Sequence, residues 1–448
     1  MRRRDVLLGV VGLTAGSLLV VGLWSAHRAW HGPIPGTAPA TSGAPALLQV
    51  EHEADHPDAR DDARAAAALA GLDLAHVTTD AAGALAPTGA GTARLTLEPD
   101  LQRSAAGILT AHHIPEAALL LMDVATGRLL AYASHVEGGP PRDLCVEATA
   151  PSASVFKIVT AAALVEDAHL GPDTRQCYSG GESRINAIDL VEDPQRDRWC
   201  TTLAGALGRS INTVFARLAS THLEPPQLEA MARRLGYGAP VPFDAPVQPS
   251  AVKMPSETLE FARTAAGFWN TTLSPLQAVD LSATVARGGD AVRPSIVETV
   301  VSPAGQVLWA APEEPAVHHV LARETAEALS AMMAHTVGEG TSWRAFHDPR
   351  GKTFLPDIEV AGKTGTLTDG ATQRYYTWFT GFAPMHPQEG ERQVAVTALA
   401  VNGPTWQVKA NVVAREMLRA YFAAQGARGV SKPSVTSIAR HKREPATK

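Results

Sequence analysis

Residues 154–165 read Ser154-Val155-Phe156-Lys157-Ile158-Val159-Thr160-Ala161-Ala162-Ala163-Leu164-Val165, and Lys157 is the one charged residue among them. Such an apolar run predicts a helix buried on nearly all sides. Burial disfavours the ammonium form of Lys157, so its pKa should fall and a neutral amine should become available as a base. Ser154 lies three residues earlier, on the same helix face, and that amine could activate its hydroxyl. For so short a pattern, a helix-capping serine followed by a snorkelling lysine is the simpler alternative.

A second short motif, Ser210-Ile211-Asn212, begins 56 residues after Ser154. We expect Ser210 to relay a proton to a leaving amine, and Asn212 to hold either Lys157 or a substrate amide. Taken alone the motif is weak, because serine and asparagine are common in turns.

A third motif, Lys363-Thr364-Gly365-Thr366, falls in a strand predicted over residues 358–368. Gly365 leaves space for a ligand backbone to lie along the strand. Lys363 supplies a positive field and Thr366 a hydroxyl for a carboxylate, while backbone N–H groups near Ser154 and Thr366 would form an oxyanion hole. One such donor stabilises a transition state by roughly 3–4 kcal/mol. Lys363 and Thr364 alternate in direction, so strand twist or an edge position must bring both to one groove.

Ser-x-x-Lys, Ser-x-Asn and Lys-Thr-Gly in this order are the signature of penicillin-recognising serine enzymes. The sequence resembles the transpeptidase domain of penicillin-binding proteins from about residue 94 to residue 422, with Ala153 where many members have glycine. The resemblance implies that Ser154 attacks a D-alanyl carbonyl of a peptidoglycan stem peptide, that Lys157 takes its proton and that Ser210 protonates the departing D-alanine. It also implies that Lys363, Thr364 and Thr366 hold the terminal carboxylate, and that β-lactams acylate the serine.

The pattern of elements predicts an α+β fold, in which helices pack an antiparallel β-sheet and an all-helical subdomain lies beside it. Predicted strands come from both ends of the domain, at residues 118–123, 129–133, 358–368, 375–382 and 394–401. Helices are predicted at residues 101–109, 154–165, 204–219, 226–235, 275–286 and 412–422.

The domain organisation is predicted in four parts. Residues 1–30 should form a membrane anchor, because residues 6–24 are uncharged and follow three arginines. Nineteen residues in a helix would span about 28 Å, close to the hydrocarbon thickness of a bilayer, and the arginines favour a cytoplasmic N-terminus. A cleaved signal peptide is the alternative. Residues 31–93 are expected to be a flexible linker with a short helical segment, residues 94–425 the transpeptidase domain, and residues 426–448 a basic tail.

Composition excludes some other classes of protein. The chain has 39 Lys and Arg against 45 Asp and Glu, a net charge of −6, which argues against nucleic acid as a partner. A zincin-like His52-Glu53-Ala54-Asp55-His56 is discounted because Pro57 follows directly, so neither a metal nor another cofactor is expected. In an oxidising compartment, Cys177 and Cys200 should form a disulfide that leaves Cys145 free.

The leading hypothesis is therefore a single-pass membrane D,D-transpeptidase, with its catalytic domain in the periplasm or outside the cell. Its expected partners are stem peptides, β-lactams, the membrane through the N-terminal helix, and proteins of a cell-wall synthesis complex. A D,D-carboxypeptidase and a class D-like β-lactamase are alternatives with the same nucleophile. A non-catalytic β-lactam sensor or wall-assembly scaffold is the alternative outside the enzymes.

Overall fold

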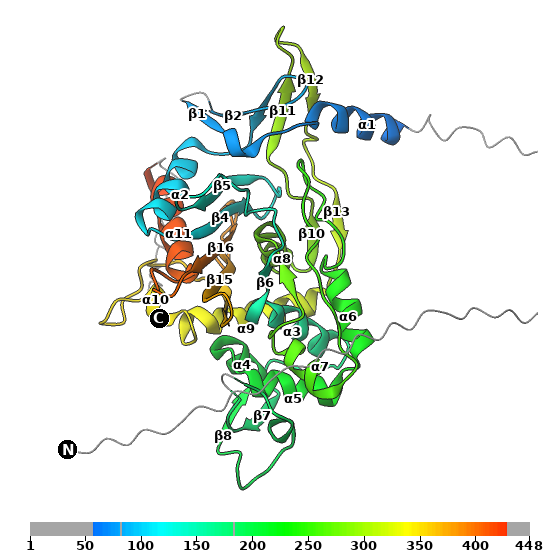
Figure 1. The fold of residues 1–448 in the computed structure, drawn as a ribbon, viewed down its shortest axis with the longest axis vertical. Coiled ribbons are helices and arrows are strands. Elements are labelled where there is room, and N and C mark those ends of the chain that lie inside the picture. Colours follow the sequence, from blue (N-terminus) through cyan, green and yellow to red (C-terminus); the bar gives the residue numbers. More distant parts are fainter. Residues whose placement is uncertain (1–56, 81–82, 182–183, 428–448) are drawn as a thin grey trace, which may run out of the picture. The chain divides into compact units, whose positions relative to one another are not determined.

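The computed structural model describes residues 57–80, 83–181 and 184–427 (Figure 1). The predicted anchor, the first part of the predicted linker, His52–His56 and nearly all of the basic tail lie outside these residues. Among the helices that are described, none combines the length and the apolar character needed to cross a membrane.

The central sheet has five antiparallel strands in the order β14-β15-β16-β4-β5. They are β4 (Glu116–Asp123), β5 (Leu129–Val136), β14 (Ala361–Asp369), β15 (Arg374–Ala383) and β16 (Val394–Asn402). The pairing of β16 with β4 joins strands from the two ends of the domain, in a register that places Val396 opposite Leu121. The predicted sheet, built from both ends of the domain, is confirmed.

Helices cover both faces of this sheet (Figure 1). One face packs against α2 (Pro99–Ala111) and α11 (Ala410–Ala427), with α10 (Trp343–Phe346) alongside, and the other against α8 (Pro275–Ala286). Along β4, Leu119 and Leu121 belong to the core on the α11 side, whereas Leu120 and Met122 belong to the core on the α8 side. Because both faces are buried, β4 is apolar at almost every position instead of alternating with polar residues.

The helical region beside the sheet contains α3 (Lys157–Glu166), α6 (Pro225–Arg234), α7 (Thr258–Ala265) and α9 (Arg323–Gly338). The prediction of a single helix over residues 204–219 was wrong. The chain instead forms α4 (Leu203–Arg209) and α5 (Asn212–His222), because Ser210 adopts the left-handed conformation with φ 58° and ψ 43°. A residue in that conformation ends an α-helix.

This region is also not all-helical, because it carries a short hairpin of β7 (Arg175–Tyr178) and β8 (Trp199–Thr202). Cys177 and Cys200 face each other in the hairpin and form a disulfide, while Cys145 is buried as a free thiol. The predicted cysteine pairing is confirmed. A second two-stranded pairing joins β6 (Ala150–Pro151) to β9 (Thr272–Leu273), and a third joins β10 (Asp290–Val292) to β13 (Val317–His319).

A second five-stranded sheet, in the order β1-β2-β3-β11-β12, was not predicted. Its strands are β1 (Thr78–Asp80), β2 (Gly83–Pro87), β3 (Thr92–Leu95), β11 (Val297–Val301) and β12 (Val307–Ala310), and α1 (Pro57–Leu69) contacts β12. The sequence predicted a linker through residue 93, whereas the described residues from 57 onward form a helix and sheet strands. The buried side chains of β2 are only Ala84 and Ala86, so the strand pattern in the sequence is weak.

Candidate active site

Lys157 has no exposed surface, and its amine lies among three oxygen atoms. Nζ is 2.8 Å from Ser154 Oγ and 2.7 Å from Asn212 Oδ1, and it also donates to the carbonyl oxygen of Ala266. A neutral amine has two N–H bonds and one lone pair. The two carbonyl oxygens can only accept, so they take the two N–H bonds and leave the lone pair directed at the Ser154 hydroxyl.

The charge state of Lys157 fits this arrangement. Burial lowers the pKa of its amine well below the ordinary lysine value, and the positive charge of Lys363 lowers that pKa further. A neutral amine in contact with a serine hydroxyl is the pairing that removes the proton from a serine nucleophile.

Two glycines lie against the backbone that leads into Ser154. Ser154 lies in the 3-10 turn η2 (Ala153–Phe156), and Ala153 before it has a φ of 47°. A Cβ on Gly267 would lie 2.4 Å from the carbonyl oxygen of Ala153, and a Cβ on Gly365 would lie 3.2 Å from the Ala153 Cβ. The nucleophile turn therefore packs between strand β14 and the 266–268 segment, so closely at Gly267 that a side chain there would clash and so closely at Gly365 that neighbouring atoms would have to shift.

Lys363 connects the second and third motifs. Its Nζ donates to Ser210 Oγ at 2.9 Å and to the carbonyl oxygen of Thr364 at 2.8 Å. The side chain is fully buried, and desolvation lowers its pKa from 10.5 to about 7. The left-handed turn at Ser210 brings both Ser210 and Asn212 to this cluster, since α4 ends before it and α5 begins after it.

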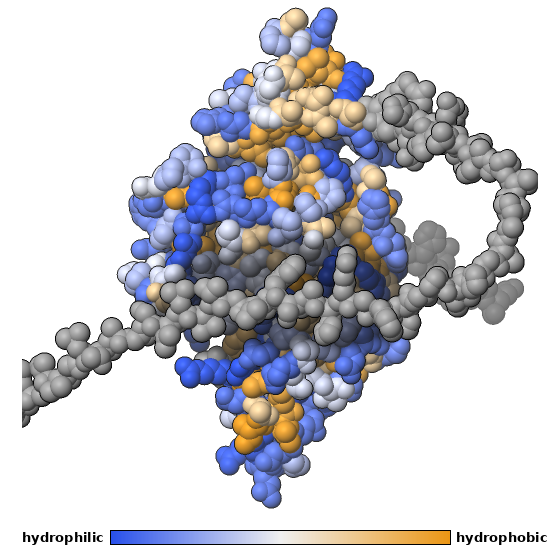
Figure 2. Space-filling model, turned by 45° about the vertical axis from the view of Figure 1, so that its right-hand side comes forward, coloured by the Kyte–Doolittle hydropathy of each residue, from blue (hydrophilic) through white to orange (hydrophobic). Residues whose placement is uncertain are grey.

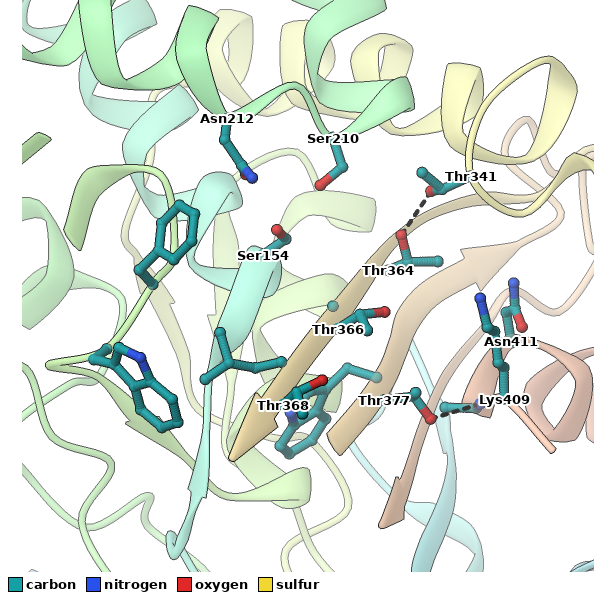
Figure 3. A pocket seen from close by; sticks show the side chains of 16 residues that line it. Ser154, Ser210, Asn212, Thr341, Thr364, Thr366, Thr368, Thr377, Lys409 and Asn411 are labelled. Carbon is teal, nitrogen blue, oxygen red and sulfur yellow. Dashed lines mark hydrogen bonds between the residues drawn. The ribbon is translucent and has the colours of Figure 1, made fainter. Parts of the chain in front are cut away.

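A cavity of about 580 Å³ opens in front of these groups (Figure 3). Strand β14 is at the edge of the central sheet, so its unpaired side runs along the cavity. Six predicted site residues line it: Ser154, Ser210, Asn212, Thr364, Gly365 and Thr366. Lys157 and Lys363 lie behind the wall and touch it through Ser154 and Ser210. The structure thus brings all eight predicted residues together.

Several further residues of the cavity were not predicted. Thr341 Oγ1 lies 2.6 Å from Thr364 Oγ1, and the Ala266 carbonyl completes the surroundings of the Lys157 amine. Additional lining residues are Phe268, Trp269, Leu367, Thr368, Thr377, Trp378, Lys409, Ala410 and Asn411. Leu367 and Thr368 follow the third motif on β14, and Thr377 and Trp378 lie on the neighbouring strand β15. The others come from loops and from the start of α11, which only the tertiary fold brings to the cavity.

Over the part of the chain that the structure describes, no three His, Cys, Asp or Glu side chains come together in a way that could hold a metal ion.

Comparison with known proteins identifies the family. The model of the penicillin binding protein transpeptidase domain matches residues 117–419, which is more than half of the chain. The chain therefore belongs to the penicillin-binding protein transpeptidase family.

Two curated relatives indicate how distant the similarity is. The peptidoglycan D,D-transpeptidase PbpA of Mycobacterium tuberculosis is 26% identical over 274 residues, which cover 59% of this chain and 52% of PbpA. Stage V sporulation protein D of Bacillus subtilis is 26% identical over 251 residues, or 54% of this chain and 37% of that protein. The chain thus spans about half the length or less of these two relatives.

Solved structures share the fold. The D,D-transpeptidase domain of a peptidoglycan glycosyltransferase from Eggerthella lenta superimposes with a TM-score of 0.61 at 24% identity, covering 75% of this chain and 84% of that one. Penicillin-binding protein A from M. tuberculosis gives a TM-score of 0.59 at 21% identity, over 74% of this chain and 81% of the other.

Proposed function

We propose that this protein is a peptidoglycan D,D-transpeptidase that works through an acyl-enzyme on Ser154 and is inhibited covalently by β-lactams. The observation that carries the proposal is the buried Lys157 amine, 2.8 Å from Ser154 Oγ, with two carbonyl oxygens fixing its other donors. A lysine placed only for structural reasons would not need its lone pair directed at a serine that lines a cavity.

The first half of the reaction uses the contacts described above. Ser154 Oγ attacks the carbonyl carbon of the penultimate D-alanine while its proton passes to Lys157. Backbone N–H groups near Ser154 and Thr366 stabilise the oxyanion. Ser210, whose oxygen accepts from Lys363 Nζ at 2.9 Å, relays the proton taken up by Lys157 to the departing D-alanine nitrogen. An acyl ester of Ser154 and free D-alanine result.

The substrate carboxylate would be held by the third motif. Thr364 and Thr366 line the cavity on the edge strand, and the Lys363 charge lies behind them. Thr341 orients the Thr364 hydroxyl through their 2.6 Å contact. A β-lactam carries a carboxylate and a strained amide, so it can occupy the same positions and acylate Ser154.

Relatives support this assignment. PbpA of M. tuberculosis is named a peptidoglycan D,D-transpeptidase, and penicillin-binding protein A of that organism has been solved as acyl-enzyme complexes with ceftriaxone and imipenem. The same type of chemistry in this chain agrees with the family to which it belongs.

The proposal extends to location and domain organisation. Residues 94–425 would form the catalytic domain outside the cytoplasmic membrane, residues 1–30 would anchor it, and residues 426–448 would be a basic tail. The Cys177–Cys200 disulfide supports an extracytoplasmic location, because disulfides persist in oxidising compartments. Proteins of a cell-wall synthesis complex are the partners this location would offer.

The test separates transpeptidation from the other reactions of the same nucleophile. Purified protein is incubated with a stem peptide ending in D-Ala-D-Ala and an amine acceptor, and products are separated by mass. Cross-linked product supports the transpeptidase. Hydrolysed peptide alone would indicate a carboxypeptidase, and steady hydrolysis of a chromogenic cephalosporin would indicate a β-lactamase. Penicillin binding without turnover of any peptide would indicate a sensor or scaffold.

A further inference from the structure

A second cavity, of about 400 Å³, adjoins the catalytic one. Ser210 and Asn212 line both cavities, and the second extends from them to Tyr178, Gly180 and Arg209. Ser210, the proposed proton relay, and Asn212, which accepts from the Lys157 amine, therefore face both cavities. The first is lined by the edge strand β14, and each cavity has a cationic side chain on its wall, Lys409 in the first and Arg209 in the second.

Arg209, which carries a guanidinium, lines this second cavity. The side chain is 54% exposed, and in the described part of the chain its ion-pair partner is Glu339 at 3.8 Å, beyond hydrogen-bond distance. Glu339 has a nearer partner in His335, whose Nδ1 lies 2.8 Å from the same carboxylate oxygen. The planar donors of Arg209 are thus suited to a carboxylate brought by a ligand.

The wall of the second cavity at Tyr178 belongs to a firmly held hairpin. The Tyr178 ring lies beside that of Trp199, with centroids 6.3 Å apart, and Trp199 is 59% exposed. Figure 2 shows apolar surface at the end of the molecule that carries the β7–β8 hairpin. The disulfide closes the hairpin, and the buried Arg217 of α5 donates to the Cys177 carbonyl at 2.8 Å and to Asp197. A ligand can therefore pack on this wall without first ordering it.

The chemistry of acyl transfer places the second substrate at this end of the site. By microscopic reversibility, the amine that attacks the acyl-enzyme takes the position from which the D-alanine nitrogen departs. Ser210 is the group proposed to protonate that nitrogen, so the acceptor amine must arrive beside Ser210. The second cavity reaches Ser210 without crossing the threonines of β14.

We infer that the cavity lined by Tyr178, Gly180, Arg209, Ser210 and Asn212 is the acceptor subsite, and that it takes an amine-bearing peptide whose carboxylate binds Arg209. This inference rests on the proposed transpeptidase function. The acceptor nitrogen attacks the acyl carbon, a C–N bond forms and the C–O bond to Ser154 breaks. One amine proton passes through Ser210 and Lys157 to Ser154 Oγ, which restores the free enzyme.

The test measures how the acyl-enzyme divides between water and acceptor. A donor stem peptide is combined with either an acidic peptide amine or its carboxamide counterpart, and the ratio of aminolysis to hydrolysis is determined in one sample. Arg209→Ala should lower this ratio about 10-fold for the acidic acceptor and leave it nearly unchanged for the carboxamide, since a charge-assisted hydrogen bond is lost only in the first case. Glu339→Gln should raise the ratio for the acidic acceptor.

Arg233→Ala is the matched control, because Arg233 is also an exposed arginine near a helix C-terminus and pairs with Glu229 away from both cavities. Equal ratios in Arg209→Ala and Arg233→Ala, or equal losses for the two acceptors, would overturn the inference. Arg209→Lys keeps the positive charge. If its ratio of aminolysis to hydrolysis stays close to that of the wild-type protein, the lower ratio in Arg209→Ala comes from the missing charge and not from misfolding. If the wild-type protein forms no acyl-enzyme with donor or penicillin, the proposed function fails. If it is acylated but its preference between the two acceptors does not depend on Arg209, only the acceptor subsite is refuted.

Discussion

Lys363 Nζ lies 2.9 Å from Ser210 Oγ, although the two residues are 153 positions apart in the sequence. On the other side of the site, Lys157 Nζ lies 2.7 Å from Asn212 Oδ1, across 55 positions. The Ser210–Asn212 turn thus separates two buried lysines and contacts both. Because the charge of Lys363 lowers the pKa of Lys157, the charged and neutral forms can be divided between them, with Lys363 protonated and Lys157 neutral.

The first prediction concerns the pH dependence of acylation by penicillin. The rate should rise as Lys157 loses its proton, because only the neutral amine can act as the base. It should fall above about pH 7 as Lys363 loses the charge that attracts the carboxylate. Lys363→Met should remove the falling limb and move the rising limb to higher pH, since the charge that lowers the Lys157 pKa is gone. Stopped-flow acylation across pH measures both limbs, and an unmoved rising limb in the variant contradicts the coupling.

The second prediction concerns the packing of the nucleophile turn. Gly267→Ala should reduce acylation more than 10-fold, because its Cβ would lie 2.4 Å from the Ala153 carbonyl and its φ is 80°. Gly107→Ala in α2 is the control, since no atom lies within 4 Å of a Cβ there. That control should stabilise the protein by roughly 0.5–1 kcal/mol, as alanine is the better helix former. Equal acylation rates in the two variants would show that the turn tolerates displacement.

The third prediction concerns Thr341. Thr341→Val keeps the shape of the side chain and removes the hydroxyl that contacts Thr364 Oγ1 at 2.6 Å. The KM of a donor with a free carboxylate should rise about 5-fold, in line with the loss of about 1 kcal/mol from a neutral hydrogen bond. Thr110→Val, on the exposed surface of α2, removes a comparable hydroxyl far from the cavity and serves as control. A change in kcat alone would contradict the proposed role in carboxylate binding.

The fourth prediction concerns the disulfide. Alkylation of the denatured, non-reduced protein should modify Cys145 alone, whereas all three cysteines should react after reduction. Opening a loop with a sequence separation of 23 should lower the free energy of unfolding by about 3 kcal/mol. Chemical denaturation of the double variant Cys177→Ser and Cys200→Ser measures this. An unchanged free energy of unfolding would mean that other contacts, such as those of Arg217, already hold the hairpin.

The parts of the fold predicted from sequence are those with strong local signals. Helix α8 begins and ends where predicted, because Ser274 caps its first turn by accepting from the Gln277 N–H and Pro275 occupies the first helical position. Strands β4, β15 and β16 were predicted as apolar runs, which their two buried faces require. The eight predicted site residues, which the structure brings together, could be named from the sequence because they fall in three short motifs.

What the sequence did not predict depends on tertiary contacts. The spacing of apolar residues predicts a helix from 204 to 219 that includes Ser210. The left-handed backbone of Ser210 does not change that spacing, so the end of α4 could not be predicted from it. Strand β1 buries no side chain and β2 buries only two alanines, so their local pattern is weak. Their sheet is completed through β3 by β11, some 200 residues farther along the chain. The carbonyl of Ala266 that contacts Lys157 is a backbone group, which every residue type has, so the sequence could not indicate this contact.

The central claim is that Ser154, activated by Lys157, forms the acyl-enzyme. Intact-protein mass after incubation with benzylpenicillin, followed by peptide mapping, tests it most directly. The wild-type protein should gain the mass of one penicillin, located on the peptide that contains Ser154. Ser154→Ala should gain none, and Lys157→Met should gain it at least ~100-fold more slowly because the base is missing. A stable adduct on Ser154→Ala, or one mapped to another residue, would contradict the account.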